Sequence, residues 1–309
     1  MARLSLLFLS LLGGAAAQLQ YTSTASSAVA AARATALTLS PTSNVVGKTF
    51  DRFVQIFLEN QDYSAAIANS NLAYLATQGI SLTQYYGVTH PSQPNYVGAA
   101  GATRNGITTN DFSRLATSVK SVVDLLEAKG ISWGVYQEDM PYSGFEGNYK
   151  NQATGADDYV RKHNPLMSYD SVTSDVNRLA KCKNFTMFNR DLANNKLPQW
   201  MFITPNMTNS GHDSSLAAAA TWSNNWITPL LANPNFNINR TLVILTFDEG
   251  TTTGTNRVYA VLLGSAIPTA KKGTTNSTTY NHYSLVKTVE VNWSLGNLGT
   301  NDISANAFF

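Results

Sequence analysis

Five hydrophobic runs rich in β-branched residues limit the possible folds of this chain more than any other feature. Four of them end at residues suited to metal or phosphate chemistry: residues 53–58 before Glu59-Asn60, 133–136 before Gln137-Glu138-Asp139, 200–204 before Pro205-Asn206, and 242–247 before Asp248-Glu249. The fifth, 258–263, is weaker and ends at Gly264-Ser265. Short apolar runs bounded by turn residues predict buried strands. Because an open parallel sheet binds ligands at the carboxyl ends of its strands, four such ends favour a hydrolase site over ordinary polar turns.

Helical patterns alternate with these strands and indicate the fold class. They cover residues 72–78, 118–129, 171–180, 214–231 and 283–293. This alternation predicts an α/β protein, a three-layer αβα sandwich whose mainly parallel central sheet is covered by helices on both faces. No internal repeat or linker divides residues 49–309, which we expect to form one catalytic domain. Residues 18–48 are rich in Ser, Thr and Ala and predict an N-terminal arm, with one helix near 28–37, that packs on the surface.

The amino terminus predicts secretion. A positive start at Met1-Ala2-Arg3, an apolar run over residues 4–12 and small residues up to Ala17 are typical of a signal peptide, here residues 1–17. No later segment approaches the ~20 apolar residues that span a bilayer. The last nine residues are too short and polar for a lipid-anchor signal. We therefore expect a secreted protein, extracellular or in the cell wall, without stable membrane insertion.

Composition argues against nucleic acid as a partner. Charged residues make up 13% of the chain, the net charge is +2, and no basic block or aromatic-plus-basic stripe occurs. The only cysteine, Cys182, excludes an internal disulfide, and its lysine neighbours predict a free surface or half-buried thiol rather than a catalytic one. Among five glycosylation sequons, Asn276 in a Gly/Thr/Ser/Asn loop is the best candidate, whereas Asn206, in the expected site, should stay unmodified.

The segment Thr89-His90-Pro91-Ser92-Gln93-Pro94-Asn95-Tyr96 predicts a nucleophile. Two prolines stiffen the backbone around Ser92. A serine on a stiff loop that leads into a helix meets the helix N-terminus, where unpaired N–H groups and the dipole favour an anion. Attack by serine on phosphorus needs activation, either by a base or by a metal that lowers the serine pKa. The alternative interpretation is an ordinary polar turn.

All four histidines of the chain lie in polar loops, next to Pro, Gly, Asn or Asp: His90, His163, His212 and His282. A single histidine is usually structural. Four of this kind indicate that at least two line a site, as ligands, as phosphate donors or as the acid that protonates the leaving group. Asp213, next to His212, is expected either to orient His212 or to donate the proton itself.

Asp248-Glu249 and Glu59-Asn60 together predict a cation site. Three carboxylates and an amide suit a divalent cation better than a bare acid–base pair. Carboxylates that are held close together also repel one another, which favours a cation between them. The alternative interpretation is a pair of solvated carboxylates in a turn.

Six motifs, in this order, resemble the phosphoesterase family of secreted acid phosphatases and bacterial-type phospholipases C, within the alkaline-phosphatase superfamily. In particular they resemble fungal phosphate-repressible acid phosphatases. The motifs are residues 57–63, 90–96, 162–165, 204–207 with 211–213, 246–249, and 282–290. The resemblance covers residue 50 to the C-terminus and implies an alkaline-phosphatase-like fold and a phosphomonoesterase activity.

The resemblance also implies roles for individual residues. A divalent metal ion would be held by Glu59, Asn60, Asp248 and Glu249. The superfamily's Ser or Thr nucleophile precedes a Pro-Asn pair, which corresponds to Ser92, and the expected catalytic set is completed by His212 and Asp213. The expected substrate contacts are His90, Asn95, Asn110, His163, Asn206 and His282. Members with two metals carry Asp and His where this chain has Asn206, Glu249 and Asn60, which favours one metal and leaves its identity open.

These observations predict a secreted acid phosphatase that uses a metal-assisted serine to hydrolyse a small phosphate monoester. A phospholipase C-type phosphodiesterase is the alternative, because it uses the same motifs on a diester. Such phospholipases are usually longer, and no added lipid-binding domain is evident here. A secreted binding or wall protein that had lost its activity would show damaged motifs, whereas all six are intact. The oligomeric state is left open.

Overall fold

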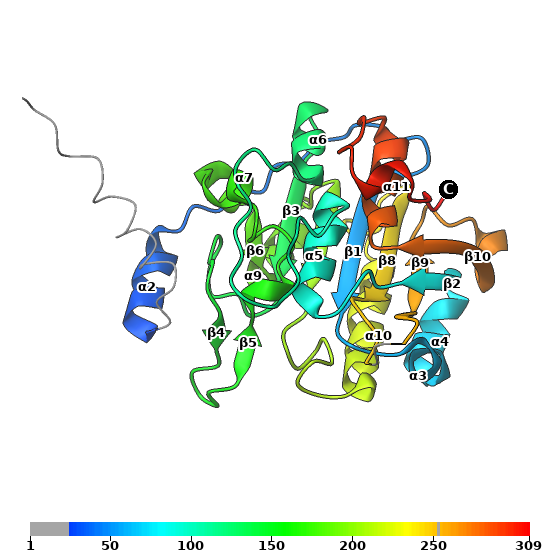
Figure 1. Cartoon of the computed structure of the whole chain (residues 1–309), viewed down its shortest axis with the longest axis horizontal. Coiled ribbons are helices and arrows are strands. Elements are labelled where there is room, and N and C mark those ends of the chain that lie inside the picture. The colour runs from blue at the N-terminus through cyan, green and yellow to red at the C-terminus, as the bar shows by residue number, and fades with distance from the viewer. Residues whose placement is uncertain (1–24, 252–253) are drawn as a thin grey trace, which may run out of the picture.

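An eight-stranded sheet forms the centre of the protein (Figure 1). The computed structural model describes residues 25–251 and 254–309. All neighbouring strands pair in parallel except β9, which is antiparallel to both β2 and β8. The strand order is β10 (Thr274–Asn281), β2 (Ile80–Tyr86), β9 (Ala260–Leu263), β8 (Thr241–Phe247), β1 (Arg52–Leu58), β7 (Trp200–Thr204), β3 (Trp133–Gln137) and β6 (Cys182–Asn184).

Helices cover both faces of this sheet (Figure 1). On one face lie α5 (Ser92–Gly101), α6 (Val122–Ala128) and α11 (Tyr283–Trp293), and on the other lie α4 (Ser70–Thr77), α9 (Phe185–Ala193) and α10 (Leu216–Ala232). This arrangement confirms the predicted three-layer α/β fold. The shorter elements are α2 (Ser26–Thr35), α3 (Tyr63–Ala68), α7 (Asp170–Thr173), α8 (Val176–Leu179), the pair β4 (Tyr149–Lys150) and β5 (Asp157–Tyr159), and the 3-10 turns η1 (Arg161–His163), η2 (Thr269–Lys271) and η3 (Asn301–Ile303).

The four strongest hydrophobic runs form β1, β3, β7 and β8, which are buried along their whole length. The predicted helices at 72–78, 214–231 and 283–293 correspond to α4, α10 and α11. The helix expected at 171–180 is interrupted, because Asp175 caps the start of α8 after α7 has ended. The fifth run forms only the short strand β9. Because β9 is antiparallel, its carboxyl end lies at the opposite edge of the sheet from the predicted site.

Three further strands, β2, β6 and β10, carry little hydrophobic signal. β10 is an edge strand whose side chains are mostly exposed. Asn276 therefore lies on β10 and not in a loop, and its Nδ2 donates to Tyr280 Oη at 3.0 Å. Cys182 is a free thiol as expected, but the expectation that it lies at the surface or half-buried is wrong. Its thiol is fully buried in β6, and burial raises its pKa to about 12, so it is a neutral core side chain.

The pairing of β1 with β8 brings the predicted site residues together. Leu58, at the end of β1, is level with Phe247, at the end of β8. The next residues, Glu59 and Asp248, therefore leave the sheet side by side, and the Asp248 N–H donates to the Leu58 carbonyl oxygen at 3.0 Å. The parallel register thus places carboxylates from distant parts of the chain at one edge.

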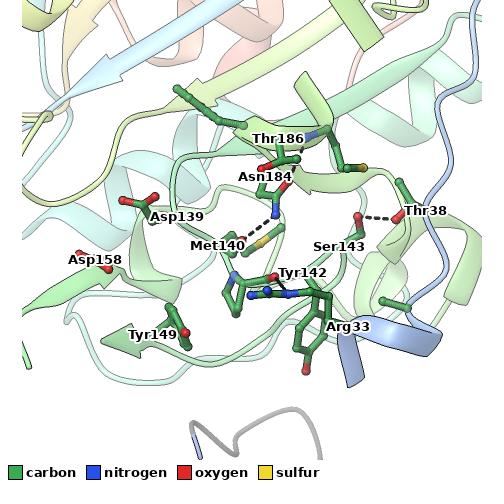
Figure 2. A pocket seen from close by; sticks show the side chains of 14 residues that line it. Arg33, Thr38, Asp139, Met140, Tyr142, Ser143, Tyr149, Asp158, Asn184 and Thr186 are labelled. Carbon is green, nitrogen blue, oxygen red and sulfur yellow. Dashed lines mark hydrogen bonds between the residues drawn. The ribbon is translucent and has the colours of Figure 1, made fainter. Parts of the chain in front are cut away.

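Residues 25–48 pack on the outside of the domain. Val29 and Ala32 of α2 contact an apolar cluster formed by Met140, Tyr142, Phe145 and Tyr159. A cavity of about 420 Å³ lies between α2, the loop after β3 and α9 (Figure 2), and none of the predicted site residues lines it. The predicted signal peptide, residues 1–17, lies outside the described residues. Within residues 25–251 and 254–309, no helix has the length and apolar character needed to cross a membrane.

The buried carboxyl group of Glu290 predicts a pH-dependent contribution to stability. Glu290 on α11 is 4% exposed, and burial, together with the neighbouring Asp302, raises its pKa from 4.5 to about 8. A carboxyl group whose folded-state pKa is raised stabilises the fold below its unfolded pKa, and this contribution is lost as the pH rises through the folded pKa. We therefore expect Glu290→Gln to raise the melting temperature at about pH 8 and to change it little at about pH 4. Equal changes at both pH values would contradict this assignment.

Candidate active site

Three buried carboxylates meet at the carboxyl ends of β1 and β8. Glu59 and Asp248 are fully buried, and Glu249 is 4% exposed. Burial raises the pKa of all three, and the Asp248 charge further raises those of Glu59 and Glu249, the latter to about 8. The N–H groups of Asn60 and Glu249 donate to Asp248 Oδ1 at 3.0 and 2.7 Å. Three acidic groups this close together can all stay ionised only beside a compensating positive charge.

The remaining oxygens of this cluster fit a divalent cation. Asp248 Oδ2 is buried and makes no hydrogen bond to any residue that the structure describes. The side-chain amide of Asn60 lies 3.2 Å from Asp248 Oδ1 and 3.3 Å from Glu249 Oε1. The amide oxygen faces these carboxylates, where it could join them as a ligand, and with the amide turned its nitrogen can donate to both. Carboxylate and amide oxygens are the donors that hard divalent cations prefer.

Ser92 lies directly against the carboxylate cluster. It is the first residue of α5 and is 1% exposed. Its hydroxyl can donate to Glu59 Oε2 at 3.2 Å or to Glu249 Oε1 at 3.3 Å. Either carboxylate can therefore accept the serine proton, and the N-terminus of α5 favours an anion at the same place.

Asn95, which was expected to contact substrate, holds the loop that carries Ser92. Its Oδ1 accepts from the N–H groups of Val88 and Thr89 at 2.9 and 3.2 Å. Its Nδ2 donates to Thr89 O at 2.9 Å and to Glu249 Oε2 at 3.2 Å. Both ends of the buried amide are thus engaged within the protein, which makes Asn95 a positioning residue.

His282 and His90 lie on different sides of the cluster. His282 is fully buried, with Nδ1 3.1 Å from Tyr85 Oη and Nε2 in contact with the Asp248 carbonyl oxygen. Burial lowers its pKa to about 4, so it supports the backbone of Asp248 as a neutral ring. His90 is 30% exposed, and its Nδ1 lies 3.1 Å from Glu249 Oε2. Of these two, His90 is therefore the one placed to reach a substrate.

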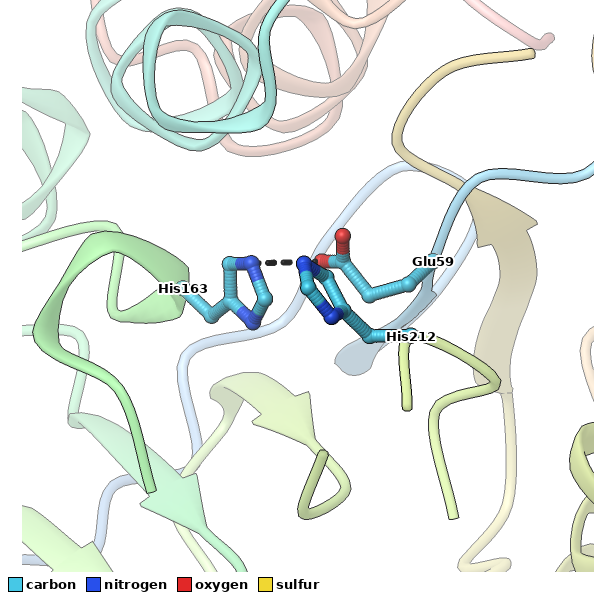
Figure 3. A group of neighbouring side chains, drawn as sticks. All are labelled: Glu59, His163 and His212. Atoms are coloured by element: carbon cyan, nitrogen blue, oxygen red, sulfur yellow. Dashed lines mark ion pairs between the residues drawn. The ribbon is translucent and has the colours of Figure 1, made fainter. Parts of the chain in front are cut away.

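His163, at the end of η1, and His212, in the loop after β7, face Glu59 (Figure 3). His163 Nε2 lies 3.3 Å from Glu59 Oε1, and burial, followed by the Lys162 charge, lowers the His163 pKa. His212 Nδ1 lies 2.6 Å from Asp213 Oδ1. One ligand atom from each of Glu59, His163 and His212 lies within 4.8 Å of the others, a set that could hold a metal. Lys162 Nζ, 3.2 Å from His212 Nε2, disfavours a second cation there and favours an anion such as a phosphoryl group.

Comparison with known proteins identifies the family. Residues 61–296 match the model of the phosphoesterase family. The chain belongs to this family. An acid phosphatase of Aspergillus fumigatus is 52% identical over 282 residues, which are 91% of this chain and 63% of that protein. The phosphate-repressible acid phosphatase of Penicillium chrysogenum is 50% identical over 277 residues, 89% of this chain and 67% of that protein. The chain thus spans about two thirds of the length of these curated relatives.

A solved structure shares the fold of this phosphoesterase. It is a protein in the alkaline phosphatase superfamily from Vibrio parahaemolyticus, with a TM-score of 0.55 at 10% sequence identity. The match covers 94% of this chain and 79% of that chain. The likeness confirms the alkaline-phosphatase-like fold that the six motifs imply.

Asn110 and Asn206 lie in different surroundings in this phosphoesterase. Asn110 Oδ1 accepts from the Gln93 N–H at 3.0 Å, and Asn110 lines a cavity of about 310 Å³ together with His212. Asn206 is turned toward the loop after β3, where its Nδ2 donates to Asp139 Oδ2 at 2.7 Å. Among the described residues, no hydrogen bond joins Asn206 to the Ser92 cluster. The structure therefore brings Asn110, but not Asn206, to the cavity beside the phosphoesterase site.

Sequence reasoning assigned no role to Tyr96 and Lys162, which also belong to the site. Tyr96 Oη donates to Glu59 Oε1, and the Tyr96 ring stacks on His163 with centroids 5.1 Å apart. Tyr96 follows Ser92 by four residues, and this spacing places both on one face of a helix. This spacing could have indicated that Tyr96 lies beside Ser92, but only once a helix was known to begin at Ser92. Lys162 carried no comparable signal beyond its place next to His163.

Proposed function

We propose that this phosphoesterase is a secreted acid phosphatase that hydrolyses small phosphate monoesters to orthophosphate. The observation that carries the proposal is Ser92, whose hydroxyl lies at the start of α5 between Glu59 and Glu249. The two fungal relatives named acid phosphatases, at 52% and 50% identity, support it. Residues 1–17 would direct secretion, and residues 49–309 would form the catalytic domain.

The reaction would proceed in two displacements at phosphorus. In the first, Ser92 Oγ forms a bond to phosphorus while the bond from phosphorus to the ester oxygen breaks, and the leaving oxygen takes a proton from His212 to depart as the alcohol. The serine proton passes to Glu59 or Glu249, which lie within 3.3 Å of Oγ. The Lys162 ammonium and the N-terminal N–H groups of α5 stabilise negative charge on the phosphoryl oxygens. In the second, water attacks phosphorus, and orthophosphate leaves as Ser92 Oγ regains a proton.

The cluster beside Ser92 would hold one divalent metal ion, through Glu59, Asn60, Asp248 and Glu249. When bound, such an ion lowers the pKa of the serine hydroxyl and neutralises charge on the phosphoryl group. The three carboxylates themselves would repel an anionic substrate. A positive charge that balances these carboxylates would therefore be needed for the substrate to bind as well as for the reaction.

Hydrolysis of p-nitrophenyl phosphate and of bis-p-nitrophenyl phosphate, each measured across pH, tests the proposed function. Faster hydrolysis of the monoester, with an acid optimum, is the expected result. Preference for the diester would favour a phospholipase C-type phosphodiesterase. Hydrolysis of neither compound would favour a binding or wall protein without catalytic activity.

His212→Ala is expected to slow hydrolysis of poor leaving groups more than of good ones. His212 Nδ1 is held by Asp213, which fixes the ring so that Nε2 faces Lys162 and the cavity. General acid help is typically worth ~10²–10⁴-fold, and an alkyl alcohol needs it more than p-nitrophenol does. The measurement is kcat/KM for glycerol 2-phosphate and for p-nitrophenyl phosphate. Equal losses in kcat/KM for both substrates would exclude protonation of the leaving group by His212. His212 would then only bind the phosphoryl oxygens.

A further inference from the structure

Phe112 is an exposed aromatic side chain in the cavity next to the catalytic residues. It is 55% exposed, although most large apolar side chains of this domain are buried. The cavity, of about 310 Å³, is lined by Phe112 together with Asn110, Lys162, His212 and Asp213. An apolar ring is unusual among these polar groups, and it shares the cavity with His212 and Asp213 of the expected catalytic set.

The loop that carries Phe112 is hydrogen-bonded to the start of α5. The Gln93 N–H donates to Asn110 Oδ1 at 3.0 Å. Gln93 Nε2 donates to the Asp111 carbonyl oxygen at 2.8 Å and lies 3.2 Å from Ser113 Oγ. Gln93 is 2% exposed and directly follows Ser92 in sequence. These bonds on both sides of Phe112 fix its position relative to the nucleophile.

Arg161 supports the Phe112 ring from one face. Its guanidinium carbon lies 3.9 Å from the ring centroid. Arg161 is 5% exposed, and its Nη2 donates to the carbonyl oxygens of Ser113, at 3.1 Å, and of Met167. A cation over one face of a ring holds the ring in place by cation–π attraction. Among the described residues, no other ring or cation stacks on Phe112, so its second face is available.

The geometry points to Phe112 as a specificity residue that stacks on a planar aromatic leaving group of the phosphate monoester. This inference rests on the proposed phosphomonoesterase activity and narrows its substrate class to aryl phosphates and nucleotides. With the phosphoryl group beside Lys162, the leaving group would share the cavity that Lys162 and Phe112 both line, so that a ring in the leaving group could stack on Phe112. Aromatic rings stack in offset arrangements that alkyl groups cannot reproduce.

The test compares three substrates on the full chain and on Phe112 variants. The substrates are phenyl phosphate, adenosine 5′-monophosphate and glycerol 2-phosphate, and the measurement is kcat/KM. We expect Phe112→Leu to lose roughly threefold to tenfold on one or both aromatic substrates and less than about twofold on glycerol 2-phosphate. Phe112→Tyr should keep the preference of the unchanged protein, because the ring is retained. Tyr74→Ala, which removes an aromatic side chain that is 45% exposed on α4, is the control for general surface effects.

Each outcome decides the inference. A loss confined to phenyl phosphate identifies aryl phosphates as the substrate class, and a loss confined to the nucleotide identifies nucleotides. Equal losses on all three substrates, or none, would overturn the role of Phe112. If the unchanged protein hydrolyses none of the three, the proposed function fails. In that case calorimetric binding of phenyl phosphonate and adenosine to the unchanged protein and to Phe112→Leu still decides whether Phe112 stacks on rings, and equal affinities would overturn it.

Discussion

Ser92→Ala is expected to abolish phosphate release, with a loss of several orders of magnitude in kcat, because removing a nucleophile eliminates the covalent route. The fold should survive, since the Ser92 hydroxyl lies among the polar groups of the site, within hydrogen-bond distance of Glu59 and Glu249, and is not part of the hydrophobic core. A net effect within ~1 kcal/mol on the free energy of unfolding is typical for one hydrogen bond. Activity with p-nitrophenyl phosphate and the unfolding midpoint in urea are the two measurements. Ser223→Ala, which removes a buried helical hydroxyl bonded to the Ala219 carbonyl oxygen, is the matched control.

The stereochemistry at phosphorus separates a nucleophilic role of Ser92 from a binding role. Two in-line displacements give net retention of configuration, and one direct attack by water gives inversion. We expect retention when the phosphoryl group of a chiral phosphate ester is transferred to an acceptor alcohol. Inversion would show that water attacks the substrate directly, and Ser92 would then be only a substrate ligand.

Asp248→Asn is expected to lower activity by orders of magnitude while the protein remains folded. Asp248 joins Glu59 and Glu249 at the edge of the sheet, and its Oδ2 has no hydrogen-bond partner within the described residues. Replacement removes one negative charge from the proposed set of metal ligands, which weakens attraction for a cation and leaves the packing unchanged. Metal content, measured by elemental analysis, should fall together with activity. Asp302→Asn, at a buried carboxylate outside the site, controls for the loss of a buried charge.

Removal of the metal tests the same cluster without a mutation. Extensive chelation should abolish hydrolysis of p-nitrophenyl phosphate, and addition of divalent cations one at a time should restore it and identify the metal. Full activity of a protein shown to be free of metal would contradict the proposed cation site. The carboxylates around Ser92 would then act only as proton acceptors.

Much of the fold followed from patterns that are local in the sequence. β1 and β8 are mostly apolar along their length, which is the pattern of a strand buried on both faces. α11 was expected at 283–293 and occurs there, because its apolar residues recur with helical spacing. β10 was missed because an edge strand can be polar, and the antiparallel direction of β9 could not be predicted because an apolar run contains no information about strand orientation.

The candidate site also has features that the sequence determined and features that only the tertiary structure decided. Sequence alone determined that Glu59 and Asp248 follow strands and that Ser92 precedes a helix, so that the three could be expected in one place. Only the tertiary structure decided what each group contacts: Asn95 holds Glu249 across 154 positions of sequence, and His282 supports the Asp248 backbone from behind. It also placed Lys162 beside His212 and turned Asn206 toward Asp139. The physical reason is that a side chain's role depends on its burial and on its hydrogen-bond partners, and both are set by segments that meet only when the sheet has formed.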